Sequence, residues 1–275
     1  MEENTSQQLK KLRTSYLVCI YSLLIFLIAG LIVLKAVGAV GFVFIALAVG
    51  AGLLSARRYK EYTGFLKEVV VRGALRRCTF LENVTYEPAD GASPEDVADT
   101  GMLELGGGFD SNDLITAECE GGVFSQCDVS ISETRGTAKD RTTYNMFVGR
   151  WLCFAPKAPE TCRIQLIGGK FHHGLAWDHL PFRGTKEEFT VYADDREAAD
   201  RLLTDTAVAA LRELQAHYKA PVMLALTGGR YYAAIETGTD AMEGAEAGKH
   251  DAEAEQKTVI EDLRINAALV TAFSQ

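Results

Sequence analysis

The chain begins with a short polar stretch and then carries two long runs without a charged side chain. The first run extends from Ser15 to Leu34 and the second from Ala36 to Ala56, with Lys35 between them. Each is close to the roughly 20 apolar residues that a helix needs to cross the hydrocarbon core of a membrane. The short connection predicts an antiparallel transmembrane helical hairpin over residues 15–56, preceded by an N-terminal tail of residues 1–14.

Small residues in both runs would let the two helix backbones approach closely. They include Gly30, Gly38, Gly41, Ala48 and Gly52. A cleaved signal peptide is an alternative for the first run, but that run exceeds the roughly 7–15 apolar residues of a signal-peptide core and a second run follows at once. A fully buried soluble hairpin is disfavoured, because two consecutive uncharged segments of this length are rare outside membranes.

Basic residues flank the predicted hairpin on both sides. Three precede the first run and three follow the second: Lys10, Lys11, Arg13, Arg57, Arg58 and Lys60. Because short cytoplasmic segments are enriched in Lys and Arg, this asymmetry places both ends of the hairpin in the cytoplasm. We therefore expect a multi-pass protein of the plasma membrane with two spans and with cytoplasmic N- and C-termini.

Residues 57–77 continue the helical pattern and are amphipathic. At the helical period, one face carries Tyr59, Tyr62, Leu66, Val69 and Val70. The segment is also basic, and it predicts a juxtamembrane helix that contacts anionic lipid headgroups. The candidate contacts are Arg57, Arg58, Lys60, Lys67, Arg72, Arg76 and Arg77. Alternatively, the apolar stripe packs against the soluble domain, and the two interpretations are compatible.

Residues 78–275 have the mixed pattern of an α+β domain with a mainly antiparallel sheet and packed helices. Short alternating or β-branched runs predict strands at 114–119, 123–132, 144–155, 162–167, 188–193, 222–227 and 230–235. Helical spacing and capping residues predict helices at 93–104, 194–203, 207–218 and 257–273. Gly228 and Gly229, between the last two strands, predict a two-residue hairpin turn.

Two segments of this domain are predicted to be loops. Gly106–Gly108 lacks the following Lys-Ser/Thr of a phosphate-binding loop and the spacing of a dinucleotide-binding motif, so we interpret it as a flexible joint. Residues 237–256 lack large apolar side chains apart from Met242 and predict a flexible, exposed acidic loop.

The charge of the chain is divided unevenly. Residues 1–77 carry eleven Lys/Arg against four Asp/Glu, so the total of −9 leaves −16 for residues 78–275. Affinity for nucleic acids depends mainly on Lys and Arg contacts to phosphates. The acidic domain is therefore not expected to bind nucleic acid in general.

Residues with catalytic or metal-binding potential occur only as fragments. No two of the six cysteines have C-x-x-C spacing, so reduced thiols are expected in a cytoplasmic domain. A mixed metal site is an alternative for Cys153, Cys162, His172 and His173, and bases or ligands are an alternative for Asp178 and His179. The acidic group Asp194, Asp195, Glu197 and Asp200 suggests a cation site, but its place at a helix start favours a structural role. We assign no catalytic residue, metal or cofactor.

Several segments in order resemble a bacterial membrane-protein family catalogued as domain of unknown function 3137. They are the hairpin, Tyr86 with Pro88, and residues 111–115 (SNDLI), 120–133 (EGGVFSQCDVSISE), 146–154 (MFVGRWLCF), 188–203 (EFTVYADDREAADRLL), 209–214 (AALREL) and 230–235 (RYYAAI). The resemblance implies a bacterial inner-membrane protein with two N-terminal spans and a cytoplasmic domain. It supplies no catalytic residues, and Gly106–Gly108 and 237–256 depart from its usual pattern.

Three functional hypotheses follow. The favoured one is a binding or scaffold module at the inner face of the membrane, with an unknown protein partner in addition to the lipid bilayer. The alternative is a membrane-tethered hydrolase or metal-dependent enzyme that uses the region of His172 and His173. A transport-associated subunit is third, because the two spans contain no ionisable residue that would mark a pathway across the membrane.

Overall fold

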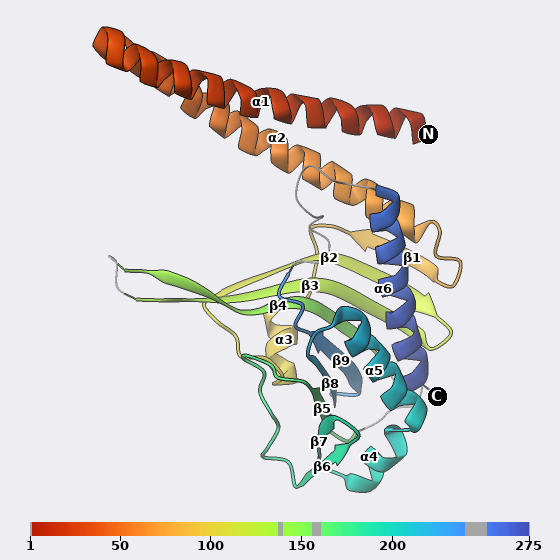
Figure 1. The fold of residues 1–275 in the computed structure, drawn as a ribbon. Coiled ribbons are helices and arrows are strands. Elements are labelled where there is room, and N and C mark those ends of the chain that lie inside the picture. Colours follow the sequence, from red (N-terminus) through yellow and green to blue (C-terminus); the bar gives the residue numbers. More distant parts are fainter. Residues whose placement is uncertain (1, 137–139, 156–160, 240–251, 275) are drawn as a thin grey trace. The chain divides into compact units, whose positions relative to one another are not determined.

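The computed structural model describes residues 2–136, 140–155, 161–239 and 252–274 of the chain (Figure 1). These residues divide into two compact units. The first contains residues 2–73 and 252–255, and the second contains the described residues from Ala74 to 239 and from Gln256 to 274. Each unit is described by itself below.

The first unit is a helical hairpin. It consists of α1 (Glu2–Val37), the short 3-10 helix η1 (Gly38–Val40) and α2 (Gly41–Leu75), which begins in this unit. Gly38 has a φ of +74°, so it supplies the left-handed backbone of the connection rather than a close helix contact. The prediction of a long N-terminal helical hairpin is confirmed.

The helices of the hairpin contact each other where small residues were expected. A Cβ added at Gly30 would lie 3.0 Å from Ile45, and one added at Gly52 would lie 2.9 Å from Leu23. Ala48 is almost fully buried. The residues between Gln7 and Leu75 form a helical region that is long and apolar enough to cross a membrane, with a mean hydropathy of 3.0 in its most apolar window.

The second unit contains one antiparallel sheet of nine strands in the order β1-β2-β3-β4-β9-β8-β5-β7-β6 (Figure 1). The strands are β1 (Glu82–Glu87), β2 (Gly108–Cys119), β3 (Gly122–Arg135), β4 (Thr142–Phe154), β5 (Ile164–Gly168), β6 (Phe182–Lys186), β7 (Phe189–Ala193), β8 (Val222–Thr227) and β9 (Arg230–Ile235). Gly228 and Gly229 have φ values of +58° and +73°, as the predicted two-residue hairpin turn requires. The predicted α+β class with a mainly antiparallel sheet is confirmed.

Four helices accompany the sheet: α3 (Pro94–Thr100), α4 (Arg196–Leu202), α5 (Asp205–Tyr218) and α6 (Ala252–Phe273). Three begin at side-chain caps, because Ser93, Asp195 and Thr204 each accept a hydrogen bond from a backbone N–H of the first turn. The cap at Asp195 supports the structural role predicted for the acidic residues at this helix start.

The two faces of the sheet have separate cores. On β3, Gln126 contacts Asn266 of α6, whereas the adjacent Cys127 belongs to a hydrophobic cluster with Val97 of α3. Because successive side chains of a strand point to opposite faces, α6 and α3 cover opposite faces of the sheet. The segment between β5 and β6 joins the α3 face, where the Trp177 indole N–H donates to the carbonyl of Gly101.

The face that carries α5 and α6 also buries a polar network. Arg150 of β4 is 1% exposed, and its Nε lies 3.0 Å from Oδ1 of Asp128. Its Nη2 lies 3.8 Å from Oδ2 of Asp262 on α6, and Oδ1 of Asp262 lies 2.6 Å from Nε2 of His217 on α5. The network thus joins two strands to both helices.

Some predicted boundaries were wrong. Strands β1 and β6 were not predicted, because both lie at sheet edges and their sequences, ENVTYE and FRGTK, lack apolar alternation. Helix α3 ends at Thr100, short of the predicted end at Glu104, because Gly101 adopts a φ of +63° and caps the helix. Gly108 already belongs to β2, and a Cβ at Gly106 would overlap the carbonyl oxygen of Ser132, so the glycine run is packed against β3.

The predicted acidic loop at 237–256 was too long at its C-terminal end. Residues 252–256 are helical, and Glu253 and Glu255 lie in the first turn of α6. Carboxylates in this position are stabilised by the partial positive charge of a helix N-terminus. The part of the loop at 240–251 lies outside the described residues.

Candidate functional site

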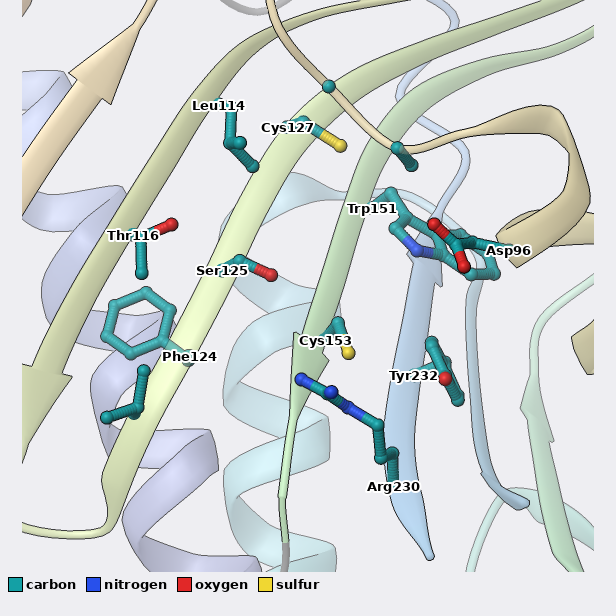
Figure 2. A pocket seen from close by; sticks show the side chains of 13 residues that line it. Asp96, Leu114, Thr116, Phe124, Ser125, Cys127, Trp151, Cys153, Arg230 and Tyr232 are labelled. Atoms are coloured by element: carbon teal, nitrogen blue, oxygen red, sulfur yellow. The ribbon is translucent and has the colours of Figure 1, made fainter. Parts of the chain in front are cut away.

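The sheet domain contains an open pocket of about 390 Å³ on the face that carries α3 (Figure 2). It is lined by Gly91, Ala92, Asp96, Leu114, Thr116, Val123, Phe124, Ser125, Cys127, Trp151, Cys153, Arg230 and Tyr232. These residues come from β2, β3, β4 and β9, from α3 and from the loop before it. This volume lies at the lower end of the range typical of small-molecule sites, which is about 300–1,000 Å³.

Strand register brings the polar side chains of the pocket into one row. Thr116 pairs with Ser125, Ser125 with Cys153, and Cys153 with Tyr232. Paired residues of neighbouring strands point to the same face of a sheet. Four strands therefore contribute two hydroxyls, a thiol and a phenol to one surface, and the neighbouring pair of Cys127 and Trp151 extends it.

The loop before α3 closes one side of the pocket and is held by Ser111. The backbone N–H of Ala92 donates to Ser111 Oγ over 2.9 Å, and this hydroxyl lies 2.9 Å from the carbonyl oxygen of Asp128, to which it donates. A Cβ at Gly91 would overlap the same hydroxyl. The absence of a side chain at Gly91 is thus required for the loop to approach β2.

The pocket lining has two charged side chains of opposite sign. Arg230 opens β9 directly after the Gly228–Gly229 turn, and Asp96 lies in the first turn of α3. Within the described part of the chain, neither side chain is seen in an ion pair. Figure 2 shows the Arg230 side chain extending toward Cys153.

Burial keeps the remaining titratable groups of the pocket neutral. It raises the pKa of the Cys153 thiol, although the nearby charge and hydrogen bond of Arg230 act in the opposite direction. Burial also raises the pKa of the Cys127 thiol and of the Tyr232 phenol. Because nucleophilic cysteines have lowered pKa values, the raised pKa of Cys153 is not that of an activated nucleophile.

Aromatic rings form one wall of the pocket. The Trp151 and Tyr232 ring centroids lie 5.8 Å apart with the ring planes inclined by 38°. Trp151 is buried and Tyr232 is half-buried, so the wall is fixed by the core on one side and open to the pocket on the other. Such a wall can take up an apolar group of a ligand.

The basic residues predicted to contact lipid lie on α2 and in the turn after it. All are exposed except for Arg58 and Lys67, which are half-buried. Arg57 and Arg58 both pair with Glu61, at 3.1 and 2.7 Å, and Arg72 pairs with Glu68 at 2.8 Å. The two acidic residues therefore offset part of the positive charge. The contact of Arg57, Arg58, Lys60, Lys67, Arg72, Arg76 and Arg77 with lipid is untested and stays a prediction.

The histidines of the alternative hypothesis face different carboxylates. His172 Nδ1 lies 3.0 Å from Oε1 of Glu236, whereas His173 Nδ1 lies 3.7 Å from Oε2 of Glu104. Among the residues that the structure describes, no three His, Cys, Asp or Glu side chains gather in a group that could hold a metal ion. The structure therefore does not bring Cys153, Cys162, His172 and His173 together as one site.

Of the pocket residues, Cys153 was considered from the sequence only as a ligand of an alternative metal site, and none was predicted to line a small-molecule pocket. The sequence gives little indication of the pocket. Ser125 and Cys127 occupy alternate positions of a strand, and small polar residues at such positions are typical of a face exposed to solvent. Arg230 follows a turn, where a charged residue is ordinary. Asp96 and Arg230 reach one cavity only through the order of the strands and the packing of α3 on the sheet, which join segments far apart in the sequence.

Comparison with known proteins gives one family match. Residues 180–275, from β6 to α6, match the sequence model of a family described as "Protein of unknown function (DUF3137)". No curated protein and no solved structure matches the chain. Of the pocket residues, Arg230 and Tyr232 lie inside the matched region, and the segments before residue 180 that suggested the same family lie outside it. The predicted resemblance is confirmed as a match to the family's sequence model over residues 180–275.

Proposed function

We propose that this chain is a membrane-anchored binding protein whose hairpin crosses the bilayer twice and whose sheet domain lies in the cytoplasm. The observation that carries the proposal is the exposed apolar surface of the hairpin. Ile25 is 64% exposed and Leu53 is 71% exposed, and only 6% of the most apolar 18-residue stretch of the hairpin is buried. Soluble proteins rarely expose an apolar surface of this extent, so lipid is the environment that suits it.

The basic flanks of the hairpin support the orientation. Basic residues precede α1's apolar run and follow that of α2, whereas Lys35 stands alone near the connection. By the positive-inside rule, the connection at Gly38 would lie on the outer side of a bacterial inner membrane and both termini on its cytoplasmic side. Each basic residue of 57–77 that reaches an anionic headgroup would strengthen the anchoring by about 1 kcal/mol.

A binding role for the domain is supported by its pocket and by its charge. The pocket is lined by fixed aromatic, hydroxyl and charged side chains, but no activated nucleophile accompanies them. The net charge of −16 on residues 78–275 suits a basic protein partner, for which the predicted acidic loop is a candidate contact. The hydrolase hypothesis has weaker support, because His172 and His173 face separate carboxylates.

Reporter fusions test the anchoring and the orientation. A reporter that is active only in the cytoplasm should be active when it is fused after Gln275. A reporter that is active only outside the cytoplasm should be active when it is inserted at Gly38. Reversed signals would overturn the orientation, and recovery of the intact chain in the soluble fraction would overturn the membrane anchor.

Crosslinking in cells tests the partner. The intact chain is compared with a variant that lacks residues 240–251. A basic protein that crosslinks reproducibly to the first and much less to the second would support the role of the loop. Equal recovery with both would remove the loop from the proposal, and the absence of any reproducible partner would argue against a scaffold.

A further inference from the structure

We propose that the pocket between α3 and strands β2, β3, β4 and β9 binds a small zwitterion, a molecule with one carboxylate, one ammonium group and an apolar body. Free amino acids with a large apolar side chain have this chemistry. Arg230 would bind the carboxylate, Asp96 the ammonium group, and the wall of Trp151 and Tyr232 the apolar body. The inference goes beyond the proposed function and depends on it only for the compartment that supplies the ligand.

The charges of the pocket lining define the ligand's charge. Asp96 and Arg230 are the two charged residues of the lining, and no ion pair is seen for either within the described residues. A cavity edged by one cation and one anion is complementary to a ligand that carries both charges.

The charges of Arg230 and Asp96 both affect the pKa values of two neighbouring groups, Cys153 and Tyr232. The Arg230 charge favours ionisation of Cys153 and Tyr232, whereas the Asp96 charge opposes it, and burial nevertheless raises the pKa of both groups. Asp96 and Arg230 therefore act on the same two groups within one small pocket, and Figure 2 shows Cys153 beside the Arg230 side chain. A ligand that reaches both charges must be short.

The pocket's chemistry argues against the larger anions that Arg residues commonly bind. A nucleotide or another polyphosphate is usually held by several cations or by a ring of backbone N–H groups. Here a single Arg230 is opposed by Asp96, which would repel a second negative charge. A volume of about 390 Å³ suits one amino acid with a large side chain better than a nucleotide.

The neutral lining suits the rest of such a ligand. The hydroxyls of Thr116 and Ser125 can each donate or accept one hydrogen bond. The Cys153 and Cys127 thiols are held protonated by burial and behave as small, weakly polar contacts. Trp151 and Tyr232 offer ring surface to an apolar side chain.

Titration calorimetry on the full chain in detergent tests the proposal with three related probes. L-Phenylalanine carries both charges, 3-phenylpropionate lacks the ammonium group, and phenethylamine lacks the carboxylate. L-Leucine and L-tryptophan vary the apolar body. We expect at least one of the three amino acids to bind, and each single-charge analogue of phenylalanine to bind about tenfold more weakly than phenylalanine, as the loss of one charge-assisted hydrogen bond implies.

Two substitutions assign each charge to its group. Arg230→Gln should weaken phenylalanine and 3-phenylpropionate about tenfold and leave phenethylamine unchanged. Asp96→Asn should weaken phenylalanine and phenethylamine and leave 3-phenylpropionate unchanged. Arg264→Gln and Asp200→Asn are the matched controls, because both side chains are exposed and lie on helices away from the pocket lining. Tryptophan fluorescence confirms that each variant is folded.

Three outcomes would overturn the proposal. The first is that none of the amino acids binds to the folded chain. The second is that the single-charge analogues bind as well as phenylalanine. The third is that both pocket substitutions weaken the binding of all probes equally. None of these results would change the activity of the topology reporters, so failure of the ligand proposal is distinguishable from failure of the membrane anchor.

Discussion

Replacing Arg150 with Met should destabilise the sheet domain more than any exposed substitution. The guanidinium of Arg150 is fully buried and lies 3.0 Å from Asp128 and 3.8 Å from Asp262. Both carboxylates are themselves nearly inaccessible. Methionine fills a similar space without a charge, so the substitution leaves Asp128 and Asp262 buried near each other without their shared cation.

Removing one partner of a buried ion pair typically costs about 3–5 kcal/mol, because the remaining charge is desolvated without compensation. For a domain of this size, each kcal/mol lowers the unfolding midpoint by about 2–4 °C. Arg150→Met should therefore lower the midpoint by about 6–20 °C. If unpaired charge is the cause, Asp128→Asn added to Arg150→Met should recover part of the loss.

Tryptophan fluorescence during heating measures this effect in the full chain in detergent. Trp151 and Trp177 are the two tryptophans of the protein, and both lie in the sheet domain, so the signal reports on that unit and not on the hairpin. Arg135→Met is the control, because Arg135 is exposed and pairs with the partly exposed Glu133 on the same strand. A midpoint for Arg150→Met within a degree or so of the control would refute the reasoning.

Three further outcomes are expected. Burial raises the pKa of the Tyr218 phenol above its value of ~10 in the unfolded chain. The neutral phenol therefore stabilises the fold below pH ~10, and this contribution to the free energy of unfolding is lost as the pH rises further. Tyr218→Phe should therefore flatten the alkaline fall in the unfolding midpoint, and an unchanged fall would contradict the assignment. Alkylation of Cys153 by iodoacetamide, followed by mass spectrometry, should be slow at neutral pH, because burial raises the pKa of the thiol, and Arg230→Gln should slow it further by removing a charge that favours the thiolate. Faster alkylation in that variant would show that Arg230 shields the thiol rather than ionising it. In the hairpin, a Cβ at Gly41 would lie 2.5 Å from neighbouring backbone, whereas one at Gly50 would contact nothing within 4 Å. Gly41→Val should thus reduce the yield of monodisperse protein in size-exclusion chromatography and Gly50→Val should not, while equal yields would argue against close helix packing.

The sequence was most informative where one physical rule dominates. An uncharged run as long as Ser15–Leu34 has few structural options, because a segment that crosses lipid has to form its backbone hydrogen bonds internally, as a helix does. The strands around Gln126 and Leu224 were predictable because they are long or fully apolar, and the Gly228–Gly229 turn has the chemistry of a hairpin. In contrast, the edge strand at Glu82–Glu87 has one buried side chain, Tyr86, and carries almost no local signal.

The pocket and the buried network were beyond local patterns for a different reason. Arg150 lies in an alternating strand, where a charged residue is normally read as facing water. Its burial depends on Asp128 of the neighbouring strand and on Asp262, more than a hundred residues away. Asp96 and Arg230 are likewise brought to one cavity by the order of the strands and by the packing of α3, neither of which periodicity determines.

Strand β3 shows how one segment serves both sides of the sheet. Ser125 and Cys127 point into the pocket, whereas Gln126 and Asp128 point to the face that α5 and α6 cover. On that face Gln126 contacts Asn266 of α6, and Asp128 contacts Arg150 of β4. The two sets alternate along the strand, so neighbouring substitutions act on different properties. Changes at Ser125 affect a surface open to solvent and to ligand, but changes at Asp128 leave a buried arginine uncompensated. Ser125, which is half-buried and open to the pocket, is therefore freer to change its chemistry than the buried Asp128 three positions further along β3.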